Sequence, residues 1–212
     1  NKNYFHFKCN ITNEDEIKRF YEKIKNIKID VLINGAAIDP KISKNQPSKN
    51  FTNYAIQNWK DTINVNLIGA VTLTKYVCKI FEKNNFVGNI INISSIYGVK
   101  APDQRIYSKN KFVNKLYKPL EYGVSKSALE SFSKGLSSYY QNTNIRVNTF
   151  SPGGVFKKNQ NKYFKENYSK KTVSGRMARL NDYDETLIYL CKRENNYLNG
   201  SNLIIDGGAS II

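Results

Sequence analysis

The sequence predicts an α/β fold in which a mostly parallel sheet carries helices on both faces. Short apolar runs rich in β-branched residues, such as Val31–Ile33 and Ile145–Phe150, alternate with segments whose apolar residues recur at helical spacing. Parallel strands need long crossovers, usually helices, and strands buried on both faces are continuously apolar. The expected strand ends at Cys9-Asn10, Asn34–Ala37, Ser94-Ser95 and Ser151–Gly154 carry small or polar residues. Ligands in such sheets bind at the carboxyl ends of strands.

The elements follow in chain order. A short alternating strand is expected at Tyr4–Lys8, followed by a helix that Thr12 or Asn13 caps ahead of three acidic residues. Further strands are expected at 31–33, 88–93, 145–150 and 203–206, and further helices at 58–83, 122–140 and 184–190. Segment 39–51 is predicted to be a loop, 99–120 a long charged insertion, and 156–171 a mobile basic stretch.

Length and composition indicate one domain that covers residues 1–212, with 40% hydrophobic residues to form a core. No apolar run approaches the ~20 residues that span a bilayer. No signal-peptide pattern is present, so we expect a cytoplasmic protein. The three cysteines are widely separated and there is one histidine, which fits neither a disulfide framework nor a metal site. We therefore expect reduced thiols.

The formal charge of +16 raises the question of nucleic-acid binding. The lysines are spread along the chain from Lys2 to Lys192, however, and no basic cluster is interleaved with aromatic residues that would stack on bases. A nucleic-acid partner is therefore not favoured, and neither is a membrane. A dispersed, solvated basic surface explains the charge more simply.

Tyr122 and Lys126 are four residues apart, on one face of a predicted helix. A cation about 5 Å from a phenol favours the phenolate by roughly 3 kcal/mol at an effective dielectric of ~20, or about two pH units. The pair is expected to exchange protons near neutral pH. The spacing alone carries little weight, because Tyr4/Lys8, Tyr21/Lys25 and Tyr107/Lys111 share it. Only Tyr122 begins a long helix that precedes a strand ending in Pro-Gly-Gly.

With that context, the sequence resembles the short-chain dehydrogenase/reductases over nearly its whole length. The resemblance rests on six motifs in the family's order. They are Val31–Ala37, Asn64–Leu67, Ile91–Ser95, Tyr122–Lys126, Ile145–Gly154, and Leu198–Gly200 with Asp206–Gly208. The resemblance implies a doubly wound Rossmann-like sheet, NAD or NADP as cofactor, a small carbonyl or alcohol substrate, and a homotetramer or homodimer.

The resemblance also implies site roles. Tyr122 would be the general acid, Lys126 would lower the pKa of that phenol and hold the nicotinamide ribose, Ser95 would hydrogen-bond the substrate carbonyl, and Asn66 would bind a relay water. The residues expected around the cofactor are Asn10, Ile11, Asn34, Gly35, Ala36, Ala37, Pro152, Gly153, Gly154 and Val155, besides Tyr122 and Lys126. Taken singly, the serines also fit strand-end hydroxyls, Asn66 a structural amide, and the glycines an ordinary turn.

The sequence departs from the family pattern in two places. The family's first βαβ unit, with its Gly-rich turn for the pyrophosphate, has no counterpart, so we expect a piece of a longer protein and cannot choose between NAD and NADP. The interval between Ser95 and Tyr122 is about twice the usual length, and Tyr107 lies nearer the usual spacing. We favour Tyr122, because the segment after it matches the active-site helix.

The insertion, residues 99–120, would then form a lid on the substrate side. Its basic residues are Arg105, Lys109, Lys111, Lys115 and Lys118. Such an insertion resembles oxidoreductases of bacterial surface-sugar and flagellin-modification pathways, and basic side chains suit a phosphorylated or nucleotide-linked sugar. We therefore expect carbonyl–alcohol interconversion on a sugar derivative. The alternatives are a 3-oxoacyl-(acyl-carrier-protein) reductase and a catalytically inactive scaffold or partner subunit.

Overall fold

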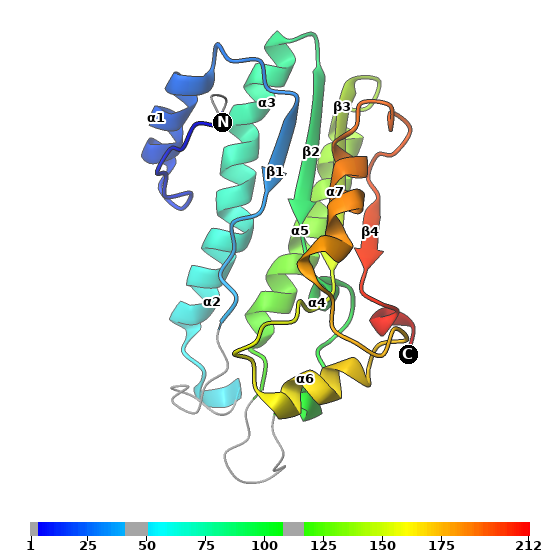
Figure 1. Cartoon of the computed structure of the whole chain (residues 1–212). Coiled ribbons are helices and arrows are strands. Elements are labelled where there is room, and N and C mark those ends of the chain that lie inside the picture. Colours follow the sequence, from blue (N-terminus) through cyan, green and yellow to red (C-terminus); the bar gives the residue numbers. More distant parts are fainter. Residues whose placement is uncertain (1–3, 41–50, 108–116) are drawn as a thin grey trace.

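The computed structural model describes residues 4–40, 51–107 and 117–212. Its sheet has four parallel strands in the order β1-β2-β3-β4 (Figure 1). They are β1 (Val31–Asn34), β2 (Val87–Ile93), β3 (Asn144–Pro152) and β4 (Asn202–Ile205). The register places Asn34 beside Asn92 and Phe150 beside Leu203. All strands therefore end at the same edge of the sheet.

Helices connect the strands. They are α1 (Glu14–Ile24), α2 (Ile56–Ile63), α3 (Ala70–Lys83), α4 (Ile96–Val99), α5 (Leu120–Tyr139), α6 (Lys162–Ser169) and α7 (Asp184–Cys191). A π-helical segment, Asn64–Gly69, joins α2 to α3 without a break, so the long helix predicted over 58–83 is confirmed with a distortion at its centre. Short 3₁₀ turns lie at Phe51–Asn53, Gln104–Ile106, Leu180–Tyr183 and Ala209–Ile211.

Apolar side chains form a separate core on each face of the sheet. Ile90 and Val147 face α3 and α5, where they pack with Phe81. The next residue of β2, Ile91, points to the opposite face and packs with Phe150 and Leu190 under α7. Alternation along a strand thus supplies both cores. The predicted α/β sheet covered on both faces is confirmed.

The predicted strands at 31–33, 88–93, 145–150 and 203–206 are present, as are the helices near 13–24, 122–140 and 184–190. The start of α1 is set by Asn13, whose side-chain oxygen accepts the backbone N–H groups of Asp15 and Glu16. These two hydrogen bonds satisfy backbone N–H groups that have no partner within the helix.

Two predictions are wrong. Residues 4–8 form no strand in the described structure, so Cys9-Asn10 is not a strand end; Tyr4 and Phe5 are 77% and 75% exposed, and no neighbouring strand supplies the hydrogen bonds that a strand needs. The basic stretch 156–171 is not irregular throughout, because it contains α6. The Asn161 side chain caps the start of that helix, and Tyr168, in its last turn, is buried.

The cysteines are free thiols: Cys78 is buried, and Cys9 and Cys191 are half-buried. Within the described ranges, no group of histidine, cysteine and acidic side chains is arranged to hold a metal ion. No helix in the same ranges has the length and apolar character needed to cross a membrane.

A buried chain of polar side chains fixes the end of β1. The Asn34 amide donates to the Thr74 hydroxyl at 2.9 Å and to the Asn92 side-chain oxygen at 2.7 Å. The Asn92 amide in turn donates to the Ser133 hydroxyl at 2.8 Å. The network joins β1 and β2 to α3 and α5, directly below the edge where the strands end.

We predict that Asn92→Ala destabilises the protein by about 1–3 kcal/mol, since it removes two hydrogen bonds from a buried polar network. Chemical denaturation measures this loss. The control is Asn159→Ala at an exposed position, which should stay within about 0.5 kcal/mol of the parent. Equal unfolding midpoints for the two variants would contradict the structural role of the network.

Candidate active site

Helix α5 carries Tyr122 in its first turn and Lys126 one turn later. Lys126 is 3% exposed, its Nζ donates to the Ile93 carbonyl at the end of β2 at 2.7 Å, and it lies 5.8 Å from the centre of the Tyr122 ring. Lys126 is therefore buried at the carboxyl edge of the sheet, and the half-buried Tyr122 lies beside it. The predicted pairing on one helix face is present.

The two serines after β2 have different partners. Ser94 is 2% exposed, and its hydroxyl donates to the Lys126 carbonyl at 3.0 Å. This hydrogen bond joins the end of β2 to α5. The Ser95 oxygen accepts the Tyr97 N–H at 3.2 Å as the cap of α4, and its side chain hydrogen-bonds Tyr122. Ser95 is therefore the serine that lies beside the phenol.

Close packing of α4 against α5 makes this meeting possible. A methyl group added at Gly98 of α4 would lie 2.9 Å from the backbone carbonyl carbon of Lys126 and 2.7 Å from the Ser94 hydroxyl. Contacts that short do not occur in relaxed structures, so only glycine permits the observed approach. The position of α4 then sets the position of Ser95.

Burial decides the protonation of the pair. It raises the pKa of Tyr122 to about 12; the charge of Asp39 adds to this rise and the hydrogen bond from Ser95 opposes it. Burial lowers the pKa of Lys126 to about 8, against the opposing effect of Asp39. The pKa of the phenol therefore lies above its usual value and not near neutrality, where the spacing of Tyr122 and Lys126 predicted it, because desolvation of the phenolate is the largest effect on it.

Asn66 lies in the π-helical segment and is 1% exposed. Its side-chain oxygen accepts the Ile38 N–H at 2.7 Å, and its amide donates to the Ile38 carbonyl at 3.0 Å and to the Ser125 hydroxyl at 2.9 Å. The side chain is thus committed to holding the segment after β1 against α5. A π-helical turn departs from the regular pattern of backbone hydrogen bonds and is frequent at functional sites.

The expected cofactor residues near β1 and the N-terminal segment divide into two groups. Gly35, Ala36 and Ala37 are exposed at the end of β1, whereas Asn34 is buried in the polar network below them.

Asn10 and Ile11 have local roles in the structure. The Asn10 side-chain oxygen accepts hydrogen bonds from the backbone and hydroxyl of Thr12. The Ile11 side chain lies against Gly69 at the end of the π-helical segment.

Two tyrosines hold the turn Pro152–Val155 at the end of β3. The Gly154 N–H donates to the Tyr168 hydroxyl at 2.6 Å, and the Tyr183 hydroxyl donates to the Gly153 carbonyl at 2.8 Å. Val155 pairs with Ala178 in an isolated bridge. Neither tyrosine lies in a motif, so neither was expected here from the sequence. Their contacts arise only when α6 and the Leu180–Tyr183 turn fold over the sheet edge.

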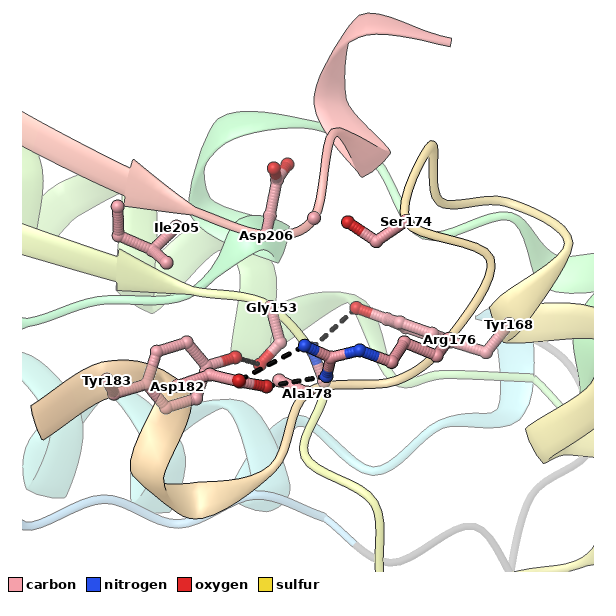
Figure 2. Close-up of a pocket in the computed structure, with 11 residues that line it drawn as sticks. Gly153, Tyr168, Ser174, Arg176, Ala178, Asp182, Tyr183, Ile205 and Asp206 are labelled. Atoms are coloured by element: carbon pink, nitrogen blue, oxygen red, sulfur yellow. Dashed lines mark hydrogen bonds and ion pairs between the residues drawn. The ribbon is translucent and has the colours of Figure 1, made fainter.

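A cavity of about 200 Å³ lies behind this turn (Figure 2). Its lining residues include Gly153, Tyr168, Arg176 and Asp206. The Arg176 guanidinium forms a bidentate ion pair with the Asp182 carboxylate. The cavity shares the Gly153-Gly154 turn with the site and none of Ser95, Tyr122 and Lys126.

The described part of the insertion packs beside the site. The Tyr107 ring stacks on Phe164 of α6 at 5.2 Å, and its hydroxyl lies 2.6 Å from that of Tyr97. Tyr107 is thus part of an apolar cluster with α6, whereas Tyr122 faces Ser95 and Lys126. Among the predicted lid cations, Lys109, Lys111 and Lys115 lie outside the described residues.

Comparison with known proteins identifies the family. Residues 1–210 match the family described as Enoyl-(Acyl carrier protein) reductase. A solved short-chain dehydrogenase from Leptospira borgpetersenii with bound NAD+ superposes with a TM-score of 0.84 at 34% identity, covering 96% of this chain and 74% of that protein. The chain belongs to the short-chain dehydrogenase/reductase family.

Other members of the short-chain dehydrogenase/reductase family match with lower coverage or identity. Post-translational flagellin modification protein A of Campylobacter coli is 35% identical over 148 residues, which are 70% of this chain and 56% of that protein. A 3-oxoacyl-(acyl-carrier-protein) reductase of Thermotoga maritima is 28% identical over 207 residues, 95% of this chain and 75% of the relative. The structure of ElxO with NADP bound shares the fold, with a TM-score of 0.82 and 23% identity, and the match covers 100% of this chain and 80% of ElxO.

The chain thus spans 56% of the flagellin modification protein and about three quarters of these other relatives. The family uses NAD or NADP.

We predict that Gly98→Ala costs about 1–3 kcal/mol, because the new methyl group must push α4 away from α5. Thermal or chemical unfolding measures the loss. The matched control is Gly135→Ala, an exposed site on α5 with nothing within 4 Å of the added methyl group. That change should stabilise the protein by up to about 1 kcal/mol, the helix-propensity gain of alanine over glycine. Equal effects at the two positions would refute the close contact.

Proposed function

We propose that this protein is an NAD(P)-dependent oxidoreductase that interconverts a carbonyl and a secondary alcohol. The observation that carries the proposal is the grouping of Ser95, Tyr122 and Lys126 at the carboxyl edge of β2, where a buried hydroxyl and a buried amine lie beside a half-buried phenol. Such a set can orient a carbonyl oxygen and give it a proton.

The residues present fit a nicotinamide cofactor. Lys126 keeps N–H groups beyond the one that it donates to Ile93, so its amine can also hold ribose hydroxyls. Gly35 to Ala37 offer exposed backbone at the end of β1, and the turn Pro152–Val155 offers a wall fixed by two tyrosines. The bound cofactor supplies or accepts the hydride; the protein supplies placement and proton transfer.

Tyr122 handles the proton. Its raised pKa, about 12, keeps the phenol protonated at neutral pH, which is the form that donates to the substrate oxygen during reduction. Ser95 donates a hydrogen bond to the same oxygen and so stabilises the negative charge that develops there. In the oxidative direction the substrate hydroxyl gives its proton to the phenolate, which forms more readily once a cation lies beside it.

Asn66 contributes through its backbone. Because its side-chain amide is committed to Ile38 and Ser125, we assign the expected water contact to its backbone carbonyl in the π-helical segment. The water would link Lys126 to solvent and return the proton to Tyr122. The side chain then serves to hold the loop after β1.

The substrate that we favour is a sugar or sugar-nucleotide derivative. Two features support it: the relationship to flagellin modification protein A, and the basic insertion 99–120, which we propose as the substrate-side lid. The described end of that insertion reaches the site, because Lys118 lies over the Tyr122 ring. The relationship to 3-oxoacyl reductases makes acyl-carrier-linked 3-oxoacyl groups the second candidate.

We predict that Tyr122→Phe lowers turnover by about 10²–10⁴-fold without unfolding the protein, because it removes the group that transfers the proton. NAD(P)H consumption with a nucleotide-linked keto-sugar and with acetoacetyl-coenzyme A measures this loss and separates the two substrate classes. The control is Tyr107→Phe, which should retain most of the activity. Unchanged turnover in Tyr122→Phe would reject the assignment.

The same assay addresses the inactive-scaffold alternative. A catalytically inactive subunit would turn over neither substrate, and fluorescence titration with NADH and NADPH would show no binding. Turnover, or binding of either dinucleotide that weakens in Lys126→Met, would exclude that alternative.

We also propose that the protein is a homo-oligomer. Apolar side chains are exposed along the helical layer formed by α2, the π-helical segment and α5, namely Ile56, Ile68, Leu120 and Val124. Exposed apolar surface of this kind marks interaction sites. Light scattering should give a dimer or tetramer mass that falls when Val124 is replaced by Asp; a monomer mass for the parent would exclude the proposal.

A further inference from the structure

Lys118 lies just before α5, and two hydrogen bonds from the Gln104 side chain to its backbone hold it in place. The Lys118 N–H donates to the Gln104 side-chain oxygen at 2.7 Å, and the Gln104 amide donates to the Lys118 carbonyl at 3.1 Å. Gln104 begins the 3₁₀ turn of the insertion. The insertion therefore holds the backbone just ahead of α5, and the Lys118 side chain extends over Tyr122 of that helix.

The Lys118 ammonium lies over the face of the Tyr122 ring, 4.4 Å from its centre. It is closer to the ring than Lys126, which lies at 5.8 Å. It also forms an ion pair with Asp39, in which the lysine side chain is 7% exposed and the carboxylate 62% exposed. A buried cation thus touches the phenol, while its counter-charge is largely screened by water.

Asp39 is held in place by the loop that follows β1. Asn66 bonds to both backbone groups of Ile38, the residue before it, and so anchors the loop to the helical layer. The ion pair therefore bridges two separately fixed parts of the site: the strand exit at β1 and the start of α5.

We propose that Lys118 is a positioning residue whose charge, balanced by Asp39, sets the pH at which Tyr122 exchanges its proton. The inference rests on the proposed function of Tyr122. A cation over an aromatic face is attracted by the ring, and the attraction grows when the phenol becomes a phenolate. Asp39 acts in the opposite direction, since its charge raises the pKa of Tyr122. Lys118 neutralises that charge at the ring.

Other polar and charged groups face Tyr122 from the elements packed around it. They are Ser95, Tyr97 with its hydrogen-bonded partner Tyr107, and Lys126. Of this set only Lys126 is a cation, and its burial lowers its pKa to about 8. Lys126 therefore holds its proton less firmly than a free lysine, and the geometry places the Lys118 ammonium nearer to the ring than Lys126.

The test is the pH–rate profile of alcohol oxidation, whose rising limb reports the loss of the Tyr122 proton, measured on the full-length protein. Lys118→Met should move the limb up by about one pH unit and lower the rate near neutrality about tenfold. Asp39→Asn should move it down, and the double variant should return it toward the parent. Lys118→Arg, which keeps the charge, should restore the parent profile.

The matched control is Lys134→Met, which breaks an exposed ion pair with Glu130 on the same helix and should leave the limb in place. A rate loss in Lys118→Met with an unmoved limb, or a shift in the control, would overturn the inference. NMR of the ¹³C-labelled tyrosine rings, with Tyr122 assigned from Tyr122→Phe, provides an activity-independent readout. A lower Tyr122 pKa in Asp39→Asn supports the inference even if the Tyr122→Phe test rejects the proposed function; an unchanged value contradicts it.

Discussion

Two hydrogen bonds between α5 and the end of β2 fix the position of everything else in this site. The Lys126 ammonium donates to the Ile93 carbonyl, and the Lys126 carbonyl accepts from Ser94. One residue of the helix is thus joined at both its side chain and its backbone to consecutive residues of the strand exit. Ser95 then follows directly, and the phenol one turn back on the helix faces it. The site is a consequence of docking one helix on one strand.

Burial gives this arrangement its chemistry as well as its shape. The polar network of Asn34, Asn92 and Ser133 lies beneath the strand ends, so the groups above it rest on a fixed and fully paired layer. Desolvation favours a neutral phenol and makes the amine less basic, which pushes Tyr122 toward the role of proton donor. Any group that carries charge into this volume acts strongly on the phenol. Lys118 and Asp39 belong to no motif, yet they place an ion pair at the face of the Tyr122 ring.

The sequence predicted the parallel sheet and the helix that carries Tyr122 and Lys126, because apolar periodicity and strand-end polarity depend on neighbours close in the chain. The structure places Ser95, rather than Ser94, beside Tyr122. The sequence misplaced a strand at residues 4–8, since alternation cannot reveal whether a partner strand is present. It also missed α6, whose helical state depends on burying Tyr168, and overestimated the effect of Lys126 on the phenol because the cost of burial is invisible in spacing.

The most direct test is a crystal structure of the protein with NADH or NADPH. We expect the nicotinamide to lie between the Pro152–Val155 turn and Tyr122, with the Lys126 amine on the adjacent ribose and the Ser95 hydroxyl facing the same space. A dinucleotide bound elsewhere, or bound with Tyr122 and Lys126 turned away from it, would contradict the assignment of this edge of the sheet as the active site.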